Sequence, residues 1–273
     1  MQQWRLAEPA LLAETPTGLL LKVRRNTGET VVLKVLSELG VHAEGDAPRT
    51  LLAIDGRGAV KVLAHKRDAL LLEHCGGGDL LAGNASFRDE DAVPIFCAVA
   101  SKLQETPVLA LPGLPSLSDR CRAIDKAIAR LAADDRCMPS FQRASALAQI
   151  RLKDAVEPVV LHGDLHHCNI LRTKRAGAWE WVTIDPQPLI GDPAYELANS
   201  FGNPLTHKDH VLDPTRPKRL AHAYASETGL DAQRLVDWAY IHCLISAAWS
   251  IEDGEDPSFR LRVAELIAPE ISA

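Results

Sequence analysis

The residue pattern changes at the glycine run Cys75–Gly78, and this change constrains the fold more than any other feature. Before the run, apolar residues come in short stretches rich in β-branched side chains, which are typical of strands. After it, they recur mainly at the spacing of amphipathic helices. Consecutive glycines leave the backbone free to turn, so the run is a natural hinge. The sequence therefore predicts an α+β protein with a small lobe over residues 1–75 and a larger, mainly helical lobe over residues 76–273.

The small lobe is predicted to be an antiparallel sheet with one helix. Leu19–Arg25 and Thr30–Leu36 flank a short N-x-G connection, a combination that favours a β-hairpin. Helical spacing over Ala47–Ile54 follows Asp46, whose side chain we expect to cap the helix. The order β-β-α-β-β is completed by two further strand-like stretches, Ala59–Ala64 and Ala69–His74.

The large lobe is predicted to be a set of helices interrupted by a short β-rich segment. The expected helices are Asp89–Glu105, Ser116–Ala133, Ser140–Ala155, Pro193–Ser200, Arg216–Thr228, Asp231–Ile251 and Ser258–Ile267. The expected strands are Val159–Leu161, Ile170–Thr173 and Trp179–Ile184.

Length and composition set the class of protein. The chain has 273 residues, of which 47% are hydrophobic, and this is enough to bury a core. It has no apolar run near the roughly 20 residues that a membrane-spanning helix needs, and its start does not have the pattern of a secretion signal. Its six cysteines are scattered without a C-x-x-C pair, which is typical of reduced thiols. We therefore expect a soluble, cytoplasmic protein without a membrane partner.

The charge balance bears on possible partners. The chain has 30 Lys and Arg against 36 Asp and Glu, a formal net charge of −6. Nucleic-acid binders usually carry a basic excess because phosphate contacts supply much of their affinity, so we expect no nucleic-acid partner. Mild acidity suits a cationic small molecule, and it is also an ordinary property of soluble proteins.

The densest group of polar residues is LHGDLHHCNI, Leu161–Ile170, and a second polar group, TIDP at Thr183–Pro186, ends a later strand. Within them, Asp164 and Asn169 are separated by four residues, and Asp185 follows the next pair of strands. Protein kinases use this order: a catalytic Asp, a metal-binding Asn four residues further on, and a second metal-binding Asp after a hairpin. The spacing predicts that Asp164 reaches an acceptor hydroxyl while Asn169 and Asp185 converge on Mg²⁺.

A lysine far upstream strengthens this interpretation. Lys34 lies in the strand-like sequence VVLKV, close to the V-A-I-K pattern whose amine contacts nucleotide phosphates. Ten residues later, Glu44 is a candidate for the carboxylate that orients this amine. The alternative is that Lys34 is an ordinary strand lysine and Glu44 a surface residue in a polar loop.

These motifs resemble a known family. HGDLHHCN, followed by IDP and GDPAYELAN, is similar to the aminoglycoside phosphotransferase family, which has a protein-kinase-like fold. Together with DGRGAVKVL, LLLEH and SAAW, they resemble more narrowly the branch of streptomycin 6-kinases and hydroxyurea phosphotransferases, from Leu19 to Trp249. The resemblance implies a two-lobed protein-kinase-like fold and ATP-dependent transfer of a γ-phosphoryl group to a hydroxyl of a small molecule. Streptomycin is the expected acceptor, and antibiotic resistance the expected role.

The resemblance also implies roles for individual residues. Asp164 would be the catalytic base, and Asn169 and Asp185 would bind the Mg²⁺ that accompanies ATP. Lys34 would bind the phosphates. The backbone of the hinge residues would hold adenine; these are Glu73, His74 and Cys75.

The sequence departs from the kinase pattern at two places. Thr15-Pro16-Thr17-Gly18 occupies the position of the G-x-G-x-x-G loop, and Asp185-Pro186-Gln187 replaces D-F-G, so activation-loop switching is not expected.

Four further residues are candidate contacts of the acceptor: Asp192, Trp249, Glu252 and Asp253. The carboxylates near the end of the last long helix could receive the guanidinium or amine groups of a cationic sugar. The alternatives are a helix cap for Asp192 and a solvated helix end for the acidic segment.

Three other functions are compatible with the sequence. The first is a kinase-like module that binds nucleotide without transferring phosphate, and the second is a kinase of an unrelated metabolite alcohol. The third is a zinc-dependent hydrolase built on His162, His166 and His167, although their spacing lacks the H-E-x-x-H pattern. Under the kinase interpretation, His162 braces the catalytic loop by hydrogen bonds.

Overall fold

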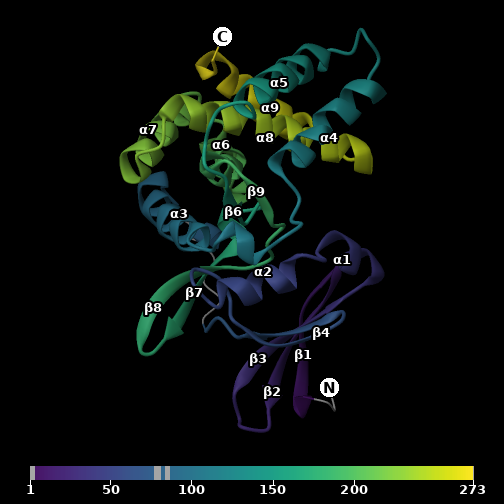
Figure 1. Ribbon diagram of the computed structural model, residues 1–273, viewed down its shortest axis with the longest axis vertical. Coiled ribbons are helices and arrows are strands. Elements are labelled where there is room, and N and C mark those ends of the chain that lie inside the picture. The colour runs from purple at the N-terminus through teal and green to yellow at the C-terminus, as the bar shows by residue number, and fades with distance from the viewer. Residues whose placement is uncertain (1–3, 77–80, 84–86, 273) are drawn as a thin grey trace.

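The computed structural model describes residues 4–76, 81–83 and 87–272, and it has a small β-rich lobe below a larger helical lobe (Figure 1). Five antiparallel strands form the sheet of the small lobe in the order β1-β2-β3-β5-β4. Their bounds are Leu6–Thr15 (β1), Gly18–Arg25 (β2), Thr30–Leu36 (β3), Val62–Lys66 (β4) and Ala69–Glu73 (β5). The predicted hairpin is confirmed as β2 and β3. Lys34 lies opposite Leu20 on β2 and Leu70 on β5, so it occupies the middle of the sheet.

The first strand, β1, is absent from our prediction. It lies at the edge of the sheet, most of its residues are exposed, and Leu11 and Leu12 face solvent. Pro9 and two irregularities in its register with β2 are compatible with an edge position, where no second neighbour needs the missing N–H. Such a strand lacks the alternation of buried and exposed residues from which strands are predicted.

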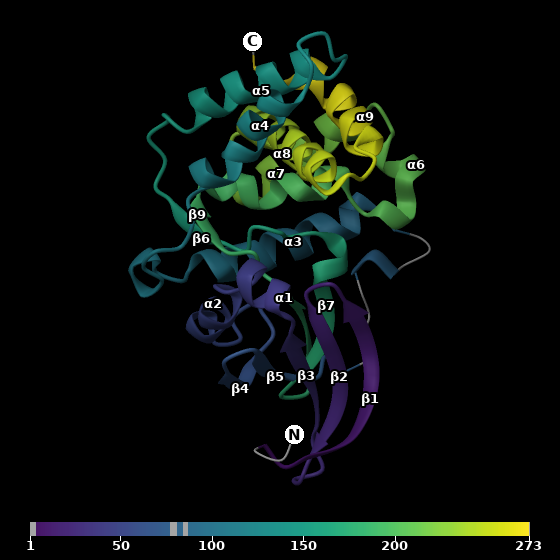
Figure 2. The same cartoon turned by 90° about the vertical axis from the view of Figure 1, so that its right-hand side faces the viewer.

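The small lobe has two helices rather than the one expected, α1 (Glu38–Ala43) and α2 (Ala47–Ile54) (Figure 2). Ser37 caps α1 by accepting a hydrogen bond from Gly40 N–H at 3.1 Å. Asp46 precedes α2 as predicted, but its side chain makes no capping bond and instead pairs with Arg49 at 2.7 Å. The six-residue α1 was missed because it is too short to show helical periodicity.

The large lobe contains the predicted helices in the predicted order. They are α3 (Asp89–Gln104), α4 (Leu117–Arg130), α5 (Met138–Arg151), α7 (Arg216–Thr228), α8 (Ala232–Asp253) and α9 (Ser258–Ile267), with the 3₁₀ helix η5 at Pro193–Gly202 and the short α6 at Lys208–Val211. The strands are β6 (Val159–Leu161), β7 (Ile170–Arg175), β8 (Ala178–Thr183) and the unpredicted β9 (Leu189–Gly191), which pairs with β6.

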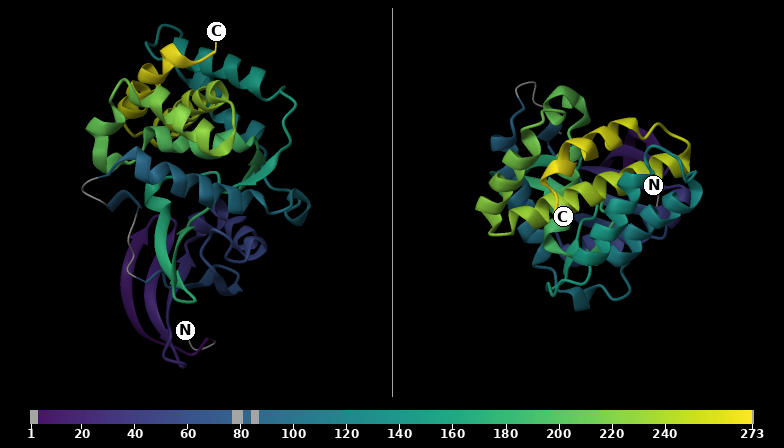
Figure 3. Two further views of the ribbon diagram at one scale, coloured as in Figure 1. Left: turned by 90° about the vertical axis from the view of Figure 1, so that its left-hand side faces the viewer. Right: turned by 90° about the horizontal axis from the view of Figure 1, so that it is seen from above.

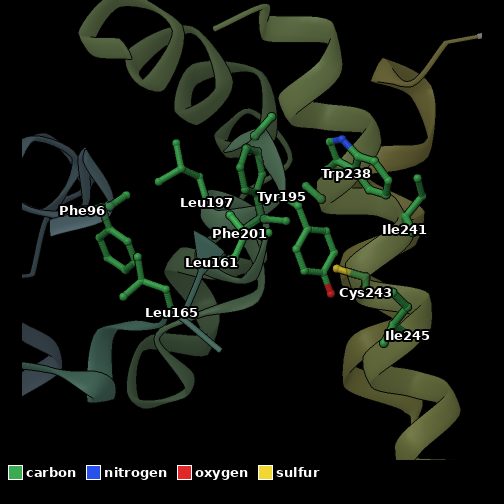
Figure 4. Close-up of a cluster of buried hydrophobic side chains, with 14 of the residues drawn as sticks. Phe96, Leu161, Leu165, Tyr195, Leu197, Phe201, Trp238, Ile241, Cys243 and Ile245 are labelled. Atoms are coloured by element: carbon green, nitrogen blue, oxygen red, sulfur yellow. The ribbon is translucent and has the colours of Figure 1, made fainter. Parts of the chain in front are cut away.

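The core of the large lobe is built around α8 and η5. All residues of α8 from Leu235 to Ile245 are buried, so the helix has no exposed face over that stretch. In Figure 4, Leu161 and Leu165 lie between Phe96 and the side chains of η5. Burying a leucine fully contributes about 1.5–3 kcal/mol, so these two residues anchor the polar loop between them to the core.

The hairpin of β7 and β8 belongs to the large lobe but lies beside the small one (Figure 3, left). Val60 N–H donates to Thr183 O at 2.8 Å, and Thr183 N–H donates to Gly58 O at 2.9 Å. Arg175 also donates to Ala59 O at 2.8 Å and pairs with Glu73. These contacts tie the end of the sheet to the strand that precedes Asp185. The boundary between lobes near residue 75 stays a prediction, because Gly77 and Gly78 lie outside the described residues.

Across the part of the chain that the structure describes, no helix is both long and apolar enough to cross a membrane.

Candidate active site

The loop from His162 to Asn169 connects β6 to β7, and its backbone is hydrogen-bonded to a buried carboxylate. Glu196 of η5 accepts hydrogen bonds from the backbone N–H groups of His162 at 2.8 Å and Gly163 at 3.2 Å. Burial raises the pKa of Glu196 to about 7, and the two backbone donors oppose this effect. Gly163 has φ +77°, and an added Cβ would lie 2.1 Å from Gln187 O, so the tight turn requires glycine.

His162 braces this loop against the segment that carries Asp185. The backbone N–H of Asp164 donates to Nδ1 of His162 at 3.2 Å, so the proton of the neutral ring lies on Nε2. This Nε2 donates to Ile184 O at 2.8 Å and lies 2.7 Å from Oγ1 of Thr183. Burial lowers the pKa of His162 to about 4, so the ring is uncharged near neutral pH. The bracing role expected of His162 is confirmed by these contacts.

Asp164 lies on the loop with both carboxylate oxygens in contact with amides. Asn199 Nδ2 donates to its Oδ1 at 2.9 Å, and Asn169 Nδ2 lies 3.4 Å from its Oδ2. The side chain is 28% exposed, so one part of the carboxylate is open to a ligand. Burial raises the pKa of Asp164 to about 7, while the charges of Arg120 and Arg260 act in the opposite direction. A carboxyl group with such a pKa can accept a proton near neutral pH.

Asn169 and Asp185 lie on neighbouring segments. Ile184 N–H donates to Asn169 O at 2.9 Å, which brings the residue before Asp185 against Asn169. Asn169 Nδ2 donates to Asp164 O at 2.9 Å, so its Oδ1 is the atom left for a ligand. Asp185 has φ +53° and a side chain that is 41% exposed. One amide oxygen and carboxylate oxygens are hard donors, the chemistry that Mg²⁺ prefers. The donor set therefore fits the expected ion.

Lys34 joins the two lobes through ion pairs. Its Nζ donates to Glu44 at 2.5 Å and to Asp185 at 2.9 Å, and the residue is 5% exposed. Burial by itself lowers the pKa of Lys34, but Asp185 and Glu44 outweigh it and raise the pKa above its usual value. The predicted pairing of Lys34 with Glu44 is present, and Glu44 is the C-cap residue of α1.

The turn Thr15–Gly18 is docked on α1. Ser37 N–H donates to Thr17 O at 2.9 Å, and Ser37 Oγ donates to Pro16 O at 2.8 Å. An added Cβ on Gly40 would lie 1.9 Å from Thr17 O, so this close approach requires glycine. The turn, α1 and Glu44 therefore form one packed unit beside Lys34.

The side chains of the predicted hinge are engaged within the protein. Glu73 accepts from Lys61 N–H at 2.8 Å and pairs with Arg175, while Cys75 is buried. His74 is half-buried, and burial lowers its pKa. Backbone groups of the segment are also engaged, because Glu73 N–H donates to Lys61 O at 3.0 Å and Gly76 N–H donates to His74 O at 2.9 Å. The contact of this segment with adenine stays a prediction.

Of the predicted acceptor residues, Trp249 contacts Arg120, which is hydrogen-bonded to the loop that carries Asp164. The guanidinium of Arg120 lies 5.3 Å from the centre of the Trp249 ring. The same guanidinium donates to Gly163 O at 3.1 Å and to Gln187 O at 2.9 Å. Glu252 and Asp253 are exposed at the end of α8, and Glu252 pairs with Arg130 at 3.1 Å.

The expectation that Asp192 contacts the acceptor needs correction. The residue is 7% exposed, and its Oδ2 accepts from Arg234 and from the Trp238 indole, each at 2.5 Å. Its Oδ1 accepts from Ala194 N–H at 2.9 Å, which confirms the alternative that Asp192 caps the following helix. A carboxylate with these three donors is not available to a ligand.

Sequence reasoning missed four residues around Asp164: Glu196, Asn199, Arg120 and Arg260. Two of them lie within the GDPAYELAN motif, so the motif was noticed but its side chains were not assigned. The two arginines have no local signal, because α4 and α9 reach the loop only through the tertiary fold.

The histidines of the loop do not converge on a metal. Both nitrogens of His162 are engaged, His166 Nδ1 accepts from Cys168 N–H at 3.2 Å, and His167 packs against Phe87 and Phe96. Over residues 4–76, 81–83 and 87–272, no group of three His, Cys, Asp or Glu side chains is placed to hold a metal ion.

Comparison with known proteins shows which family the chain is similar to. A family profile described as aminoglycoside/hydroxyurea antibiotic resistance kinase matches residues 3–254. A streptomycin 3''-kinase from Klebsiella pneumoniae is 33% identical over 264 residues, which cover 93% of this chain and 92% of the relative. A streptomycin 6-kinase from Streptomyces glaucescens is 32% identical, with 93% of this chain and 81% of the relative covered. A hydroxyurea phosphotransferase from Kitasatospora aureofaciens is 30% identical, with 98% and 76% covered.

Solved structures show the same fold at low sequence identity. A thermostable mutant of aminoglycoside phosphotransferase APH(4)-Ia, in a ternary complex with ADP and hygromycin B, matches with a TM-score of 0.68 at 14% identity, covering 100% of this chain and 97% of that one. The choline kinase LicA from Streptococcus pneumoniae matches with a TM-score of 0.66 at 16% identity, covering 98% and 95%. The kinase-like fold is thereby confirmed. On the profile match and the relatives above 30% identity, the chain belongs to the aminoglycoside/hydroxyurea antibiotic resistance kinase family.

Proposed function

We propose that the protein transfers the γ-phosphoryl group of ATP to a hydroxyl group of streptomycin or of a closely related aminoglycoside. The observation that carries the proposal is the meeting of Lys34, Asp164, Asn169 and Asp185 at the junction of the lobes. The similarity to two streptomycin kinases supports this choice of acceptor. A cytoplasmic location, where ATP is available, is part of the proposal.

Each residue has a distinct role in this reaction. Asp164 orients the acceptor hydroxyl and takes its proton while the acceptor oxygen forms a bond to phosphorus. The bond from phosphorus to the β,γ-bridging oxygen breaks, and ADP leaves with that oxygen. Asn169 and Asp185 would hold Mg²⁺, which neutralises phosphate charge when it is bound. Lys34 contacts the phosphates, and Glu44 keeps its ammonium group in place.

The charges around the loop bear on the acceptor. The guanidinium of Arg120 lies 5.3 Å from the centre of the Trp249 ring, and aromatic rings of this kind attract cations. Two exposed carboxylates lie at the end of the same helix: Asp253, and Glu252, which pairs with Arg130. A guanidinium-bearing sugar is the kind of molecule that such a surface attracts.

An acceptor screen with purified protein tests the proposal. ADP release would be measured with streptomycin, hygromycin B, hydroxyurea and choline, each with and without Mg²⁺. We expect Mg²⁺-dependent turnover with streptomycin, abolished in Asp164→Asn and retained in Cys168→Ser, a conservative change in the same loop. The relatives include both 6-kinases and a 3''-kinase, so the hydroxyl that is phosphorylated has to be determined. NMR of the product would locate the phosphate.

Other outcomes of the screen would replace the proposal. Turnover only with hydroxyurea or with another alcohol would assign a different acceptor. Binding of MgATP, seen as a thermal shift, without product from any acceptor would indicate a nucleotide-binding module. Full activity in Asp164→Asn would refute the assigned base.

A further inference from the structure

We propose that Asn199 is a positioning residue that holds the carboxylate of Asp164 in the orientation needed for phosphoryl transfer. The inference rests on the proposed function, because it assigns a partner to the proposed base. The two residues are 35 positions apart in sequence, and Asn199 Nδ2 donates to Asp164 Oδ1 at 2.9 Å. Asn199 is 6% exposed and lies on η5, within the core of the large lobe.

The orientation of the Asn199 amide is set by a second asparagine. Asn203 Nδ2 donates to Asn199 Oδ1 at 2.8 Å and to Asn199 O at 2.9 Å. Because Oδ1 of Asn199 receives this bond, only its Nδ2 can face Asp164. If the Asn199 amide were flipped, its Oδ1 would face the Asp164 oxygen and its NH2 group would face the NH2 group of Asn203. The network therefore admits one orientation.

This pair of asparagines is itself anchored in the core. Arg216 is 1% exposed, and its Nη2 donates to Asn203 O at 3.0 Å and to Ser200 O at 3.2 Å. Its Nη1 donates to Phe201 O at 2.7 Å, and its guanidinium pairs with Asp89 at the start of α3. A buried arginine with these partners has little freedom to move. The chain of contacts therefore runs from α3 and α7 to Asp164.

As a consequence, the two carboxylate oxygens of Asp164 have different hydrogen-bonding environments. Oδ1 is engaged by Asn199, while Oδ2 faces Asn169 at 3.4 Å and His166 Nε2 at 3.7 Å, both longer contacts. Oδ2 is therefore the oxygen left to take the proton of the acceptor. Without Asn199 the carboxylate could rotate about its χ2 angle, and rates of such transfers depend steeply on the alignment of the reacting groups.

Kinetics of matched variants test the inference. In Asn199→Leu, which has a similar volume, we expect kcat to fall about 10- to 100-fold while KM for ATP changes less than about twofold. Asn203→Leu should lower kcat as well, because it releases the Asn199 amide. The double variant should be no slower than Asn199→Leu alone, since both changes remove the same restraint. Ser200→Ala lies in the same segment and should lower the melting temperature without lowering kcat.

A purely structural role for Asn199 gives a different result. In that case Asn199→Leu and Ser200→Ala would both lower the melting temperature, and kcat per folded molecule would be unchanged. Any effects of Asn199→Leu and Asn203→Leu on kcat would be independent, so they would add in the double variant. Either unchanged kcat or additive kcat effects would overturn the proposal.

Crystal structures separate failure of this inference from failure of the proposed function. We expect the Asp164 carboxylate to keep its orientation in the wild type and in Ser200→Ala and to rotate in Asn199→Leu. An unchanged carboxylate in Asn199→Leu would refute the inference even if the wild type phosphorylates streptomycin. A rotated carboxylate together with a wild type that phosphorylates no acceptor would support the positioning role and refute the proposed function alone.

Discussion

Replacing Arg216 by methionine tests how the scaffold behind the candidate site is held. All three nitrogens of the Arg216 guanidinium are used: Nε and Nη2 donate to Asp89, and Nη1 and Nη2 donate to three backbone carbonyls of residues 200–203. Asp89 is nearly as buried as Arg216. Methionine fills much of the same volume but donates no hydrogen bond, so the variant leaves a buried carboxylate and three buried carbonyls without their donor.

The magnitude follows from the burial of this pair. Removing one partner of a buried ion pair costs about 3–5 kcal/mol. His210 at 3.0 Å and Arg219 at 3.5 Å stay near Asp89, so we expect Arg216→Met to lie near the lower end of that range. For a chain of 273 residues, an unfolding entropy of roughly 2.1 cal/mol/K per residue converts a loss of about 3 kcal/mol to a melting temperature lower by about 5 °C.

Two variants act as controls for this prediction. Arg219→Met removes the half-exposed partner of Asp89 and should cost less than about 1 kcal/mol. Asp89→Leu combined with Arg216→Met removes both buried charges and should be less destabilising than Arg216→Met alone. The assays are urea unfolding followed by circular dichroism and scanning calorimetry. The reasoning would be refuted if Arg216→Met and Arg219→Met lowered the free energy of unfolding equally. It would also be refuted if the double variant were less stable than Arg216→Met alone.

Four predictions concern the reaction itself. Because burial raises the pKa of Asp164 to about 7 and the base acts unprotonated, kcat/KM should rise with pH through about 7, reaching at pH 6 about one tenth of its plateau. Lys34→Met should raise KM for ATP about 10- to 100-fold in steady-state assays, because a charged donor to the phosphates is lost. Asp185→Ala should raise the Mg²⁺ concentration needed for half-maximal rate more than it raises KM for streptomycin, in a Mg²⁺ titration of the rate. Trp249→Ala should raise KM for streptomycin about 3- to 30-fold and leave KM for ATP unchanged.

Each of these predictions has its own contradicting result. A pH profile that is flat between pH 5 and 8 would exclude titration of the base in this range. An unchanged KM for ATP in Lys34→Met, or an unchanged Mg²⁺ requirement in Asp185→Ala, would remove those residues from the nucleotide site. If Trp249→Ala and Trp249→Phe raised KM for streptomycin equally, the loss of the aromatic face would not be the cause.

Most of the fold follows from local patterns in the sequence. The hairpin of β2 and β3 is marked by two β-branched stretches around a turn, and the long helices by their apolar spacing. The candidate site residues Lys34, Asp164, Asn169 and Asp185 were also predicted from short sequence motifs and their order in the chain. These features depend on neighbours in sequence, so the sequence alone is enough to predict them.

Other elements depend on contacts that no local pattern records. The edge strand β1 is mostly exposed, and α1 is a six-residue helix that is stabilised by Ser37 and by its packing on Thr17. Glu44 reaches Lys34 because α1 docks on the β1–β2 turn.

The residues that surround Asp164 show the same division. Asp164 itself was predicted from its motif, but Asn199 and Arg120 come from η5 and α4 and meet the loop only after the large lobe has packed. Asp192 was misjudged for the same reason, because its partners Arg234 and Trp238 lie more than forty residues away. A motif determines which groups can do chemistry, whereas the three-dimensional packing of distant helices determines which carboxylates are left free to do it.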